Sequence, residues 1–304
     1  MGVGTHVRMH EGPECSCLRS NVKLRCERDV IVRYYRENQY FYDRFWKDRV
    51  TLSMNYGIWF EGTKTLSQAF DQQNKLIADA LMPSPSDVVL EAGCGTGGSS
   101  IWLAKTIGCK VVGITLSDEQ VRTARNYAAR LNVRDRTDFL VMDFLNTCFR
   151  AGTFTRIFAS ESACYAPSKR DFIAEAYRLL ADSGILVVMD GFLARETLDK
   201  MEQRLFSAWC RGWAVPNLTE TQRFASYLRE VGFRDVQFTD LTRNIGPSSK
   251  RIFIRGLLGY PLLRTLRAIG LASDVQVGNA SASIYQYLLF LRGVGTYGLF
   301  VARK

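Results

Sequence analysis

The stretch VVLEAGCGTGG, residues 88–98, decides the fold, because in it an apolar strand runs directly into a glycine-rich turn. Gly93, Gly95 and Gly98 satisfy G-x-G-x-x-G, the pattern of a strand–turn–helix unit that binds a dinucleotide. Glu91 stands just before the first glycine, and a carboxylate aimed at the turn repels a pyrophosphate but attracts a ligand with a positive end. The glycines have a second interpretation, namely that they only allow a strand and a helix to pack tightly.

Short apolar segments alternate with helical segments along the chain around this turn. The strands that we expect cover residues 88–91, 110–114, 138–142, 156–159 and 185–189, and helices are expected after Gly98 and over residues 118–131 and 169–180. Such alternation is typical of a parallel sheet in an α/β fold, with helices on both faces. Residues 231–242 predict another strand, and residues 297–304 predict a last strand at the edge of the sheet.

The other segments indicate how the chain is organised. Residues 1–27 are expected to be a disordered leader, and residues 28–82 a helical cap with apolar residues at helical spacing over 29–50 and 66–81. Residues 83–304 then form the main domain, with helical lid insertions at about 193–228 and 244–290.

Three features of the sequence bear on the compartment. No run approaches the ~18 uncharged apolar residues of a membrane span. The N-terminus has no apolar core of a secretory signal. The eight cysteines are scattered, several of them inside apolar runs, which is typical of reduced cysteines. We therefore expect a cytoplasmic protein with no stable membrane insertion.

Charge and histidine content limit the chemistry. The formal net charge of +10 favours an anionic partner, such as nucleic acid, a membrane surface or a phosphorylated small molecule, although surface cations can also serve solubility alone. The two histidines, His6 and His10, both lie in the leader. A core without histidine excludes serine-triad, cysteine–histidine and histidine-ligated metal chemistry.

The residues that follow the second and third strands identify the nucleotide. In an open α/β sheet these strand ends contact the ligand, and NAD requires an acid ~20 residues after the turn. Here Thr115 ends the second strand and Gln120 follows one helical turn later, while Asp143 and Phe144 end the third. A carboxylate beside an aromatic ring suits an adenine amine and ring face. With Glu91 facing a positive end, the set predicts S-adenosylmethionine, which carries an ammonium and a sulfonium, rather than NAD.

These motifs resemble the successive motifs of the class I S-adenosylmethionine-dependent methyltransferases. The resemblance is carried by VLEAGCGTGGSSIWLA, VVGITLSDEQ, MDF and FIAEAYRLLADSGILVVMDGF. MNYGIW before them and SASIYQYLLFLRGVGTYGLFVARK after them are similar to the branch of sterol, tocopherol and cyclopropane-fatty-acid-type enzymes and bacterial prenyl-diphosphate and terpenoid C-methyltransferases. The resemblance implies a Rossmann-like, seven-stranded, mostly parallel sheet with a helical N-terminal cap and helical lid insertions.

The resemblance also implies roles for single residues. Glu91, Gly93 and Gly95 would hold the methionine end of S-adenosylmethionine, and Tyr56 and Gly57 would close over it. Thr115, Leu116 and Gln120 would contact the ribose, and Asp143 and Phe144 the adenine. Ser160 and Glu161 would lie beside the transferred methyl. Related enzymes often have a histidine shortly after this point, where this sequence offers Tyr165.

For the acceptor, the resemblance favours an alkene carbon of a prenyl diphosphate or terpenoid, as in secondary metabolism. Methylation there leaves a carbocation, which needs aromatic faces and one base. We expect Glu161 to be the base, with Tyr165 as the second catalytic residue; alternatively, Glu161 only orients the cofactor amine or caps a turn. The alternative reactions are methylation of an aromatic, tocopherol-like carbon, of nitrogen or of oxygen. A noncatalytic protein that binds S-adenosylmethionine also fits.

The acceptor site is expected in the cap and the lid. The candidate substrate-binding residues are Tyr35, Trp46, Phe192, Trp209 and Arg251, although aromatic residues on amphipathic helices also serve as core. Basic lid residues could bind a diphosphate, with Mg²⁺ held through it and no metal site among the side chains, or be a solvated helix face. A nucleic-acid substrate is not expected, because ASESACYAP lacks the proline-rich Asn/Asp motif of those enzymes. The cap could also pack on a second copy of the chain.

Overall fold

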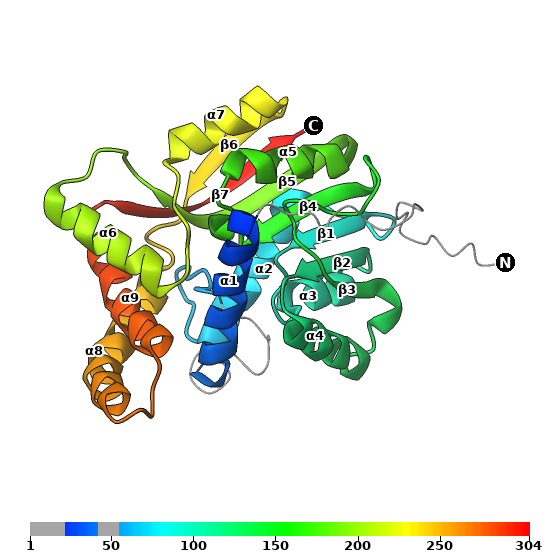
Figure 1. Cartoon of the computed structure of the whole chain (residues 1–304). Coiled ribbons are helices and arrows are strands. Elements are labelled where there is room, and N and C mark those ends of the chain that lie inside the picture. The colour runs from blue at the N-terminus through cyan, green and yellow to red at the C-terminus, as the bar shows by residue number, and fades with distance from the viewer. Residues whose placement is uncertain (1–21, 42–54) are drawn as a thin grey trace.

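A seven-stranded sheet organises the part of the chain that the computed structural model describes, which is residues 22–41 and 55–304, with side chains for 28–38 and 55–304. The strand order is β3-β2-β1-β4-β5-β7-β6 (Figure 1). The strands are β1 (Val88–Ala92), β2 (Lys110–Thr115), β3 (Thr137–Val141), β4 (Phe154–Ser160), β5 (Leu180–Leu193), β6 (Arg234–Asp240) and β7 (Gly295–Arg303). β1 to β5 run parallel, and β7 runs antiparallel to both of its neighbours. The predicted α/β fold with a mostly parallel, seven-stranded sheet is confirmed.

One strand lies elsewhere than predicted. β7 was expected at the edge of the sheet, but it pairs with β5 on one side and with β6 on the other. The prediction of an edge position is therefore wrong, and β6 forms that edge. The apolar run of β7 fits this internal position, because both of its faces are buried.

Helices cover both faces of the sheet, as the alternation of strands and helices along the chain predicts. α2 (Leu66–Leu81), α3 (Gly98–Thr106) and α4 (Asp118–Arg130) share a core with Val89 and Val111. α5 (Lys169–Leu179) and α7 (Thr221–Val231) share the opposite core with Leu90 and Val112 (Figure 1). α6 (Lys200–Gly212), α8 (Gly246–Ala268) and α9 (Asp274–Leu291) pack together at the left of the figure. The short 3₁₀ helices η3 (Arg134–Arg136) and η4 (Ala163–Tyr165) lie in connections.

The N-terminal helix α1 (Val22–Phe41) begins inside the range expected to be a disordered leader. That expectation is wrong for residues 22–27, whose sequence VKLRCE contains no glycine or proline to stop a helix. α1 is tied to α9, since Tyr34 donates a hydrogen bond of 2.9 Å to Asn279 and the Ser273 hydroxyl donates to Glu37. α1 is thereby held against a helix far away in the sequence.

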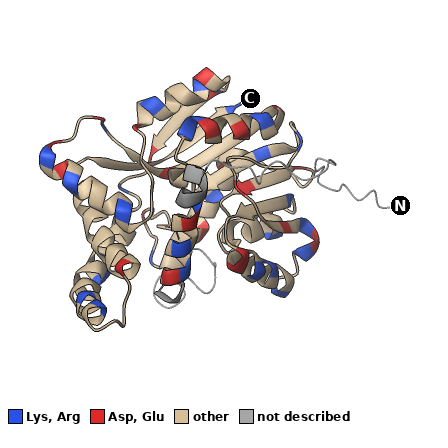
Figure 2. Cartoon of the chain, in the orientation of Figure 1, with Lys and Arg blue, Asp and Glu red and all other residues tan. Residues whose placement is uncertain are grey.

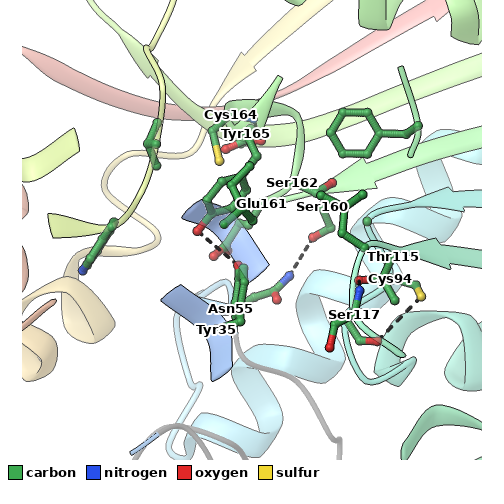
Figure 3. A pocket seen from close by; sticks show the side chains of 18 of the residues that line it. Tyr35, Asn55, Cys94, Thr115, Ser117, Ser160, Glu161, Ser162, Cys164 and Tyr165 are labelled. Atoms are coloured by element: carbon green, nitrogen blue, oxygen red, sulfur yellow. Dashed lines mark hydrogen bonds between the residues drawn. The ribbon is translucent and has the colours of Figure 1, made fainter. Parts of the chain in front are cut away.

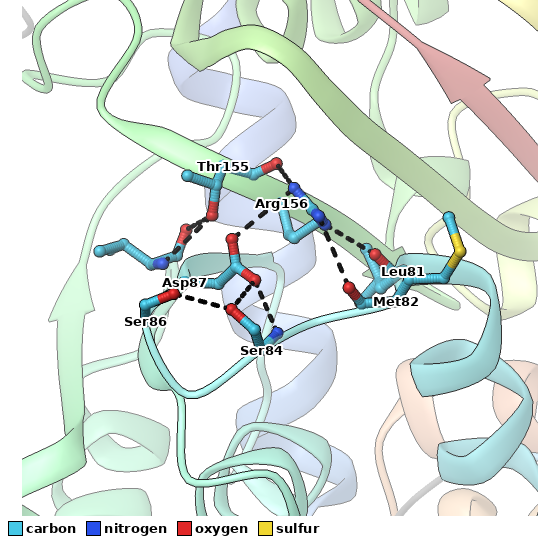
Figure 4. A network of polar contacts seen from close by, with 8 residues as sticks. Leu81, Met82, Ser84, Ser86, Asp87, Thr155 and Arg156 are labelled. Atoms are coloured by element: carbon cyan, nitrogen blue, oxygen red, sulfur yellow. Dashed lines mark hydrogen bonds and ion pairs between the residues drawn. The ribbon is translucent and has the colours of Figure 1, made fainter.

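The connection from α2 to β1 is fixed by polar contacts (Figure 4). α2 starts with a capping box between Thr65 and Gln68 and ends at Met82, whose backbone is left-handed. Arg156 on β4 donates a 2.7 Å hydrogen bond to the Leu81 carbonyl and pairs with Asp87. These contacts satisfy helix-end carbonyls and fix the entry to β1, which leads to the glycine turn.

Among the cysteines with described side chains, Cys94, Cys109, Cys164 and Cys210 carry free thiols. Cys148 is disulfide-bonded. The disulfide at Cys148 differs from the expectation of reduced cysteines. In the described part of the chain, no helix combines the length and the apolar character that crossing a membrane requires.

Two glycines let α6 and α9 approach closely. A Cβ atom on Gly212 of α6 would lie 2.4 Å from the carbonyl oxygen of Gly278 on α9 and 2.6 Å from the Cβ of Ala282. Such distances are far below van der Waals contact, so only glycine fits at residue 212. The approach matters for function because α6 carries Trp209 and α9 carries Phe290, whose rings lie 5.9 Å apart.

We predict that Gly212→Ala lowers the free energy of unfolding by about 1–3 kcal/mol, as overpacking does. Gly259→Ala on α8 is the matched control, because a Cβ there meets nothing within 4 Å. It should be neutral or stabilise by up to about 1 kcal/mol through helix propensity. Urea denaturation followed by circular dichroism measures both, and equal midpoints for the two variants would contradict the close approach.

Candidate active site

A cavity opens where the carboxyl ends of β1 to β5 meet, beneath α1 (Figure 3). Its position follows from the topology, because strand order reverses beside β1 and leaves a crevice between β1 and β4. Most of the residues predicted from the sequence line this cavity: Tyr35, Tyr56, Glu91, Gly93, Gly95, Thr115, Leu116, Gln120, Asp143, Phe144, Ser160, Glu161, Tyr165 and Trp209.

Three predicted residues that the structure describes do not line the cavity. Gly57 lies behind it, where its amide donates to Gln73 and its φ of +71° forms a turn against α2. Phe192 packs in the opposite core against Phe300 at 5.2 Å, so its prediction as a substrate contact is wrong. Arg251 lies on α8 over the ring of Trp59 at 5.8 Å and not in the cavity. Trp46 lies outside the described residues.

The glycine turn brings the chain close to the end of β4. Gly93 has a φ of +84°, and a Cβ there would lie 2.4 Å from the Cβ of Ser162. The amides of Gly93 and Cys94 both donate to the Ile114 carbonyl at 2.9 Å, which fastens the turn to β2. Glycine at residue 93 is therefore required by a close approach as well as by its backbone conformation.

Glu91 lies beneath the turn, with 4% of its surface exposed. Ser100 on α3 donates to its Oε2 from both the backbone, at 3.0 Å, and the hydroxyl. Burial raises the pKa of Glu91 to about 8, although the hydrogen bonds from Ser100 oppose that rise. A bound cation reverses the effect of burial, so this carboxyl suits the ammonium of a methionine end.

The ends of β2 and β3 present the polar groups expected for a nucleoside. Thr115 donates from its hydroxyl to Oε1 of Gln120 at 2.7 Å, so both side chains are fixed beside each other. Asp143 accepts from the Leu145 amide at 2.9 Å, and Phe144 packs edge-on against Phe172 at 5.4 Å. These groups form one wall of the cavity, and their assigned contacts to ribose and adenine stay predictions.

The sequence did not predict a partner that α1 brings to Asp143. Arg28 forms an ion pair with the Asp143 carboxylate at 2.5 Å, across the mouth of the cavity. No motif signals this contact, because Arg28 lies in a helix whose position is set by its packing on α9. The carboxylate expected to face an adenine amine thus already has a cationic neighbour.

Ser160 at the end of β4 is held by two amides. Asn55 donates to its hydroxyl at 2.7 Å (Figure 3). Gln73 on α2 donates to the same hydroxyl at 2.9 Å. Neither residue was predicted from the sequence, although Asn55 is part of the MNYGIW stretch that carried the resemblance. They join the segment before α2 to the strand end next to the expected methyl group.

Glu161 connects three segments of the chain. Its Oε1 accepts from the Tyr56 amide at 2.9 Å and from the Tyr297 hydroxyl of β7 at 2.8 Å. Its backbone is left-handed, with a φ of 52°, an uncommon conformation for a residue with a side chain. Burial raises its pKa to about 8, and the nearby Asp190 adds to the rise. Both described hydrogen bonds end on Oε1, so Oε2 keeps its lone pairs for a proton.

Aromatic rings surround one end of the cavity. Tyr56 contacts the rings of Tyr297 at 5.7 Å and Trp213 at 6.4 Å, and Trp209 contacts Trp213 at 5.8 Å. The Nε1–H of Trp209 is buried and has no acceptor among the described residues. Tyr165 accepts from the Tyr35 hydroxyl at 3.1 Å beneath α1. Tyr297 and Trp213 were not predicted, since nothing in the sequence indicates that β7 and α6 meet here.

The ionisable side chains that line the cavity are mainly acidic. Glu91, Asp143, Glu161 and Asp190 contribute carboxyl groups, whereas Arg28 is the cation among the described lining residues and pairs with Asp143. Within the described residues, no three histidine, cysteine or acidic side chains are grouped so that they could hold a metal ion. The lining therefore fits a positively charged ligand such as S-adenosylmethionine.

Comparison with known proteins supports this fit. Residues 89–184 match the family model of a methyltransferase domain. The tocopherol O-methyltransferase of Arabidopsis thaliana is 24% identical over 79% of this chain and 73% of its own. The sterol 24-C-methyltransferase of Eremothecium gossypii is 26% identical over 70% of this chain and 57% of its own. The chain thus spans somewhat more than half of that sterol enzyme.

Among solved structures, the geranyl diphosphate C-methyltransferase of Streptomyces coelicolor A3(2) has the same fold. It superposes with a TM-score of 0.70 at 21% identity, covering 91% of this chain and 98% of its own. That structure holds Mg²⁺, geranyl diphosphate and S-adenosyl-L-homocysteine.

We predict that Asp143→Asn weakens binding of S-adenosylmethionine about 10- to 100-fold, the effect of losing a hydrogen bond to a charged group. Asp138→Asn, at an exposed residue of β3, is the matched control and should leave the affinity unchanged. Titration calorimetry measures both variants. An unchanged affinity for Asp143→Asn would show that the adenine amine binds elsewhere.

Proposed function

Because this chain is a class I S-adenosylmethionine-dependent methyltransferase of the branch with the sterol, tocopherol and geranyl diphosphate enzymes, we propose that it methylates an alkene carbon of a terpenoid. In this proposal the acceptor is uncharged, and Glu161 removes the proton. The observation that carries the proposal is Glu161 itself, a carboxyl with a raised pKa among aromatic rings at the end of β4.

The chemistry makes use of this environment. Bound S-adenosylmethionine supplies an electrophilic methyl group. The alkene carbon of the acceptor bonds to it as the carbon–sulfur bond breaks, so S-adenosylhomocysteine leaves and the acceptor carries the positive charge. Glu161 then takes a proton from the neighbouring carbon on Oε2, and the remaining electron pair forms the new double bond. The proton passes to water when the product leaves.

The aromatic rings at one end of the cavity would stabilise the carbocation that this reaction forms. The ring centroid of Tyr56 lies 6.4 Å from that of Trp213 and 6.4 Å from that of Phe290, and all three residues line the cavity. Ring faces attract a cation by about 0.5–2 kcal/mol each, more where water is excluded. Tyr165 with Tyr35 borders the same space beneath α1, and we propose that the pair limits access of water to the cation.

Charge determines which terpenoid we propose. Once bound S-adenosylmethionine favours the ionised form of the lining carboxyls, they would repel a diphosphate, and the lining arginine is already paired with Asp143. Among the described residues, no cluster of carboxyl groups would hold Mg²⁺. An alcohol, ketone or ether oxygen instead suits the buried Nε1–H of Trp209, which lacks an acceptor among the described residues. The proposed substrate is therefore a neutral terpenoid that carries an oxygen, and diphosphate and Mg²⁺ are not required.

A second candidate is methylation of oxygen on an aromatic acceptor. It is favoured by the similarity to the tocopherol O-methyltransferase. Glu161 would then take the proton from a phenol instead of from carbon, with the same placement of the methyl group. The two reactions differ in the position of the new methyl in the product.

The acceptor class is tested with geraniol, farnesol and geranylgeraniol, their diphosphates with Mg²⁺, and a chromanol, each with S-adenosylmethionine. We predict that an alcohol gains one CH₂ on carbon and outpaces its diphosphate in kcat/KM by at least about tenfold, equivalent to about 1.4 kcal/mol of repulsion. Mass spectrometry measures the gain of one CH₂, and NMR of the product locates the new methyl group. A preference for a diphosphate would contradict the charge argument, and a methylated phenol would favour the second candidate.

The role of Glu161 predicts both a rate and a pH profile. Glu161→Gln should lower kcat about 10²- to 10⁴-fold and leave the affinity for S-adenosylmethionine within a few-fold. Because only the carboxylate accepts a proton, kcat should rise with pH and level off. Its midpoint should lie below the value of about 8 in the free protein, because the positively charged methyl donor favours the carboxylate.

Two further variants complete this test. Glu161→Asp keeps a carboxyl group and should keep the rise with pH at a lower kcat. Glu119→Gln, at an exposed residue of α4, should change neither kcat nor its pH profile. Near-normal turnover by Glu161→Gln would remove Glu161 as the base.

A further inference from the structure

The outward face of α8 is apolar, which is unusual for a helix at the surface of a protein. The fractional exposure of the side chain is 46% for Ile254, 75% for Leu258 and 60% for Leu262. These residues follow one another at intervals of four, so they form one stripe along the helix. A surface helix ordinarily turns such a stripe toward the core.

The opposite face of α8 explains why the stripe is outward. The residues of α8 that are buried include Ser248, Ser249 and Gly256, which are small, beside Ile252. A Cβ on Gly256 would lie 2.9 Å from the carbonyl oxygen of Ala280, so α8 sits close to α9 through small residues. Ile252 and Phe253 serve this packing, the latter at 4.7 Å from the ring of Tyr287, whereas Ile254, Leu258 and Leu262 do not take part in it.

The stripe is part of a larger exposed apolar surface, which we call the α8 face. It extends past the end of the helix, since Ile269 and Leu271 are 65% and 72% exposed. In full, its large apolar members are Ile254, Leu257, Leu258, Leu262, Ile269 and Leu271. So many exposed residues on one projecting element indicate a surface that binds something.

Cations border the α8 face and identify its partner. α8 contains Lys250, Arg251, Arg255, Arg264 and Arg267 and no acidic residue, and Figure 2 shows blue without red along this helix. By the 100° step of a helix, Lys250 continues the row of the stripe toward the start of α8, and Arg251 and Arg255 lie beside it. Arg264 lies toward the opposite side of the helix, about 120° from Leu258. Arg267 pairs with Asp274 at the start of α9.

We propose that the α8 face binds the surface of an anionic lipid membrane. Apolar side chains enter the boundary between head groups and acyl chains, while flanking guanidinium and ammonium groups contact anionic head groups. This arrangement needs no spanning helix, which agrees with the described helices. A second copy of this chain would bring cations against cations on a self-complementary face, so charge favours lipid over self-association.

The position of the α8 face relates membrane binding to the access of the acceptor to the cavity. α8 packs on α9, which contributes Phe290 to the wall of the cavity. An acceptor dissolved in lipid would therefore be held next to the elements that line the site. Membrane binding itself does not depend on which acceptor is methylated.

The test is co-sedimentation of the full-length protein with vesicles of phosphatidylcholine alone or mixed equally with phosphatidylglycerol. The wild-type chain should bind the anionic vesicles and bind phosphatidylcholine at least about tenfold more weakly. Leu258→Ser with Leu262→Ser should lower binding to the anionic vesicles at least about tenfold, because apolar burial is lost. Lys250→Gln with Arg251→Gln should lower it about tenfold or more, since each cation near the surface contributes about fivefold.

The matched control is Leu131→Ser with Leu291→Ser, which removes two leucines that are 37% and 67% exposed, one just after α4 and one at the end of α9. It should bind vesicles as the wild-type chain does, and all variants should keep their affinity for S-adenosylmethionine. Absence of vesicle binding, or equal binding by the Leu258/Leu262 variant, would overturn the proposal. So would light scattering that shows a wild-type dimer and a monomeric Leu258/Leu262 variant, because the α8 face would then join two copies.

Discussion

Three segments far apart in the sequence meet at one atom, Oε1 of Glu161. The amide of Tyr56 and the hydroxyl of Tyr297 both donate to it, so the segment before α2, the end of β4 and the strand β7 are held together. The left-handed backbone of Glu161 directs the side chain to this meeting point. Removing the carboxyl would leave two buried donors without an acceptor, which costs about 1–3 kcal/mol for each donor.

The arrangement ties stability to chemistry. The same burial that raises the pKa of Glu161 also places it among Tyr56, Trp213 and Tyr297, whose rings exclude water. Glu91 shows the same combination beneath the glycine turn, with Ser100 in place of the tyrosines. Two carboxyl groups with raised pKa values therefore face a cavity where a cationic ligand would favour their ionised form.

Much of this could be predicted from the sequence, for reasons of geometry. In a parallel sheet, residues just after the strands share one edge, so Glu91, Thr115, Asp143 and Glu161 could be placed together without coordinates. Phe192 shares the α5 face of β5 with Leu186 and Val188, a placement that the two-residue period of a strand predicts. Contacts between distant elements, such as Arg28 with Asp143 or Tyr297 with Glu161, have no local signal, because packing of α1 and the antiparallel pairing of β7 create them.

The ion pair between Arg28 and Asp143 has a consequence for how a nucleoside enters. If Asp143 holds the adenine amine as proposed, molecules in which Arg28 occupies the carboxylate are not competent to bind. The apparent dissociation constant then equals the intrinsic one divided by the competent fraction. Each exchange of spent for fresh methyl donor would then require the Arg28 side chain to leave the Asp143 carboxylate and return to it.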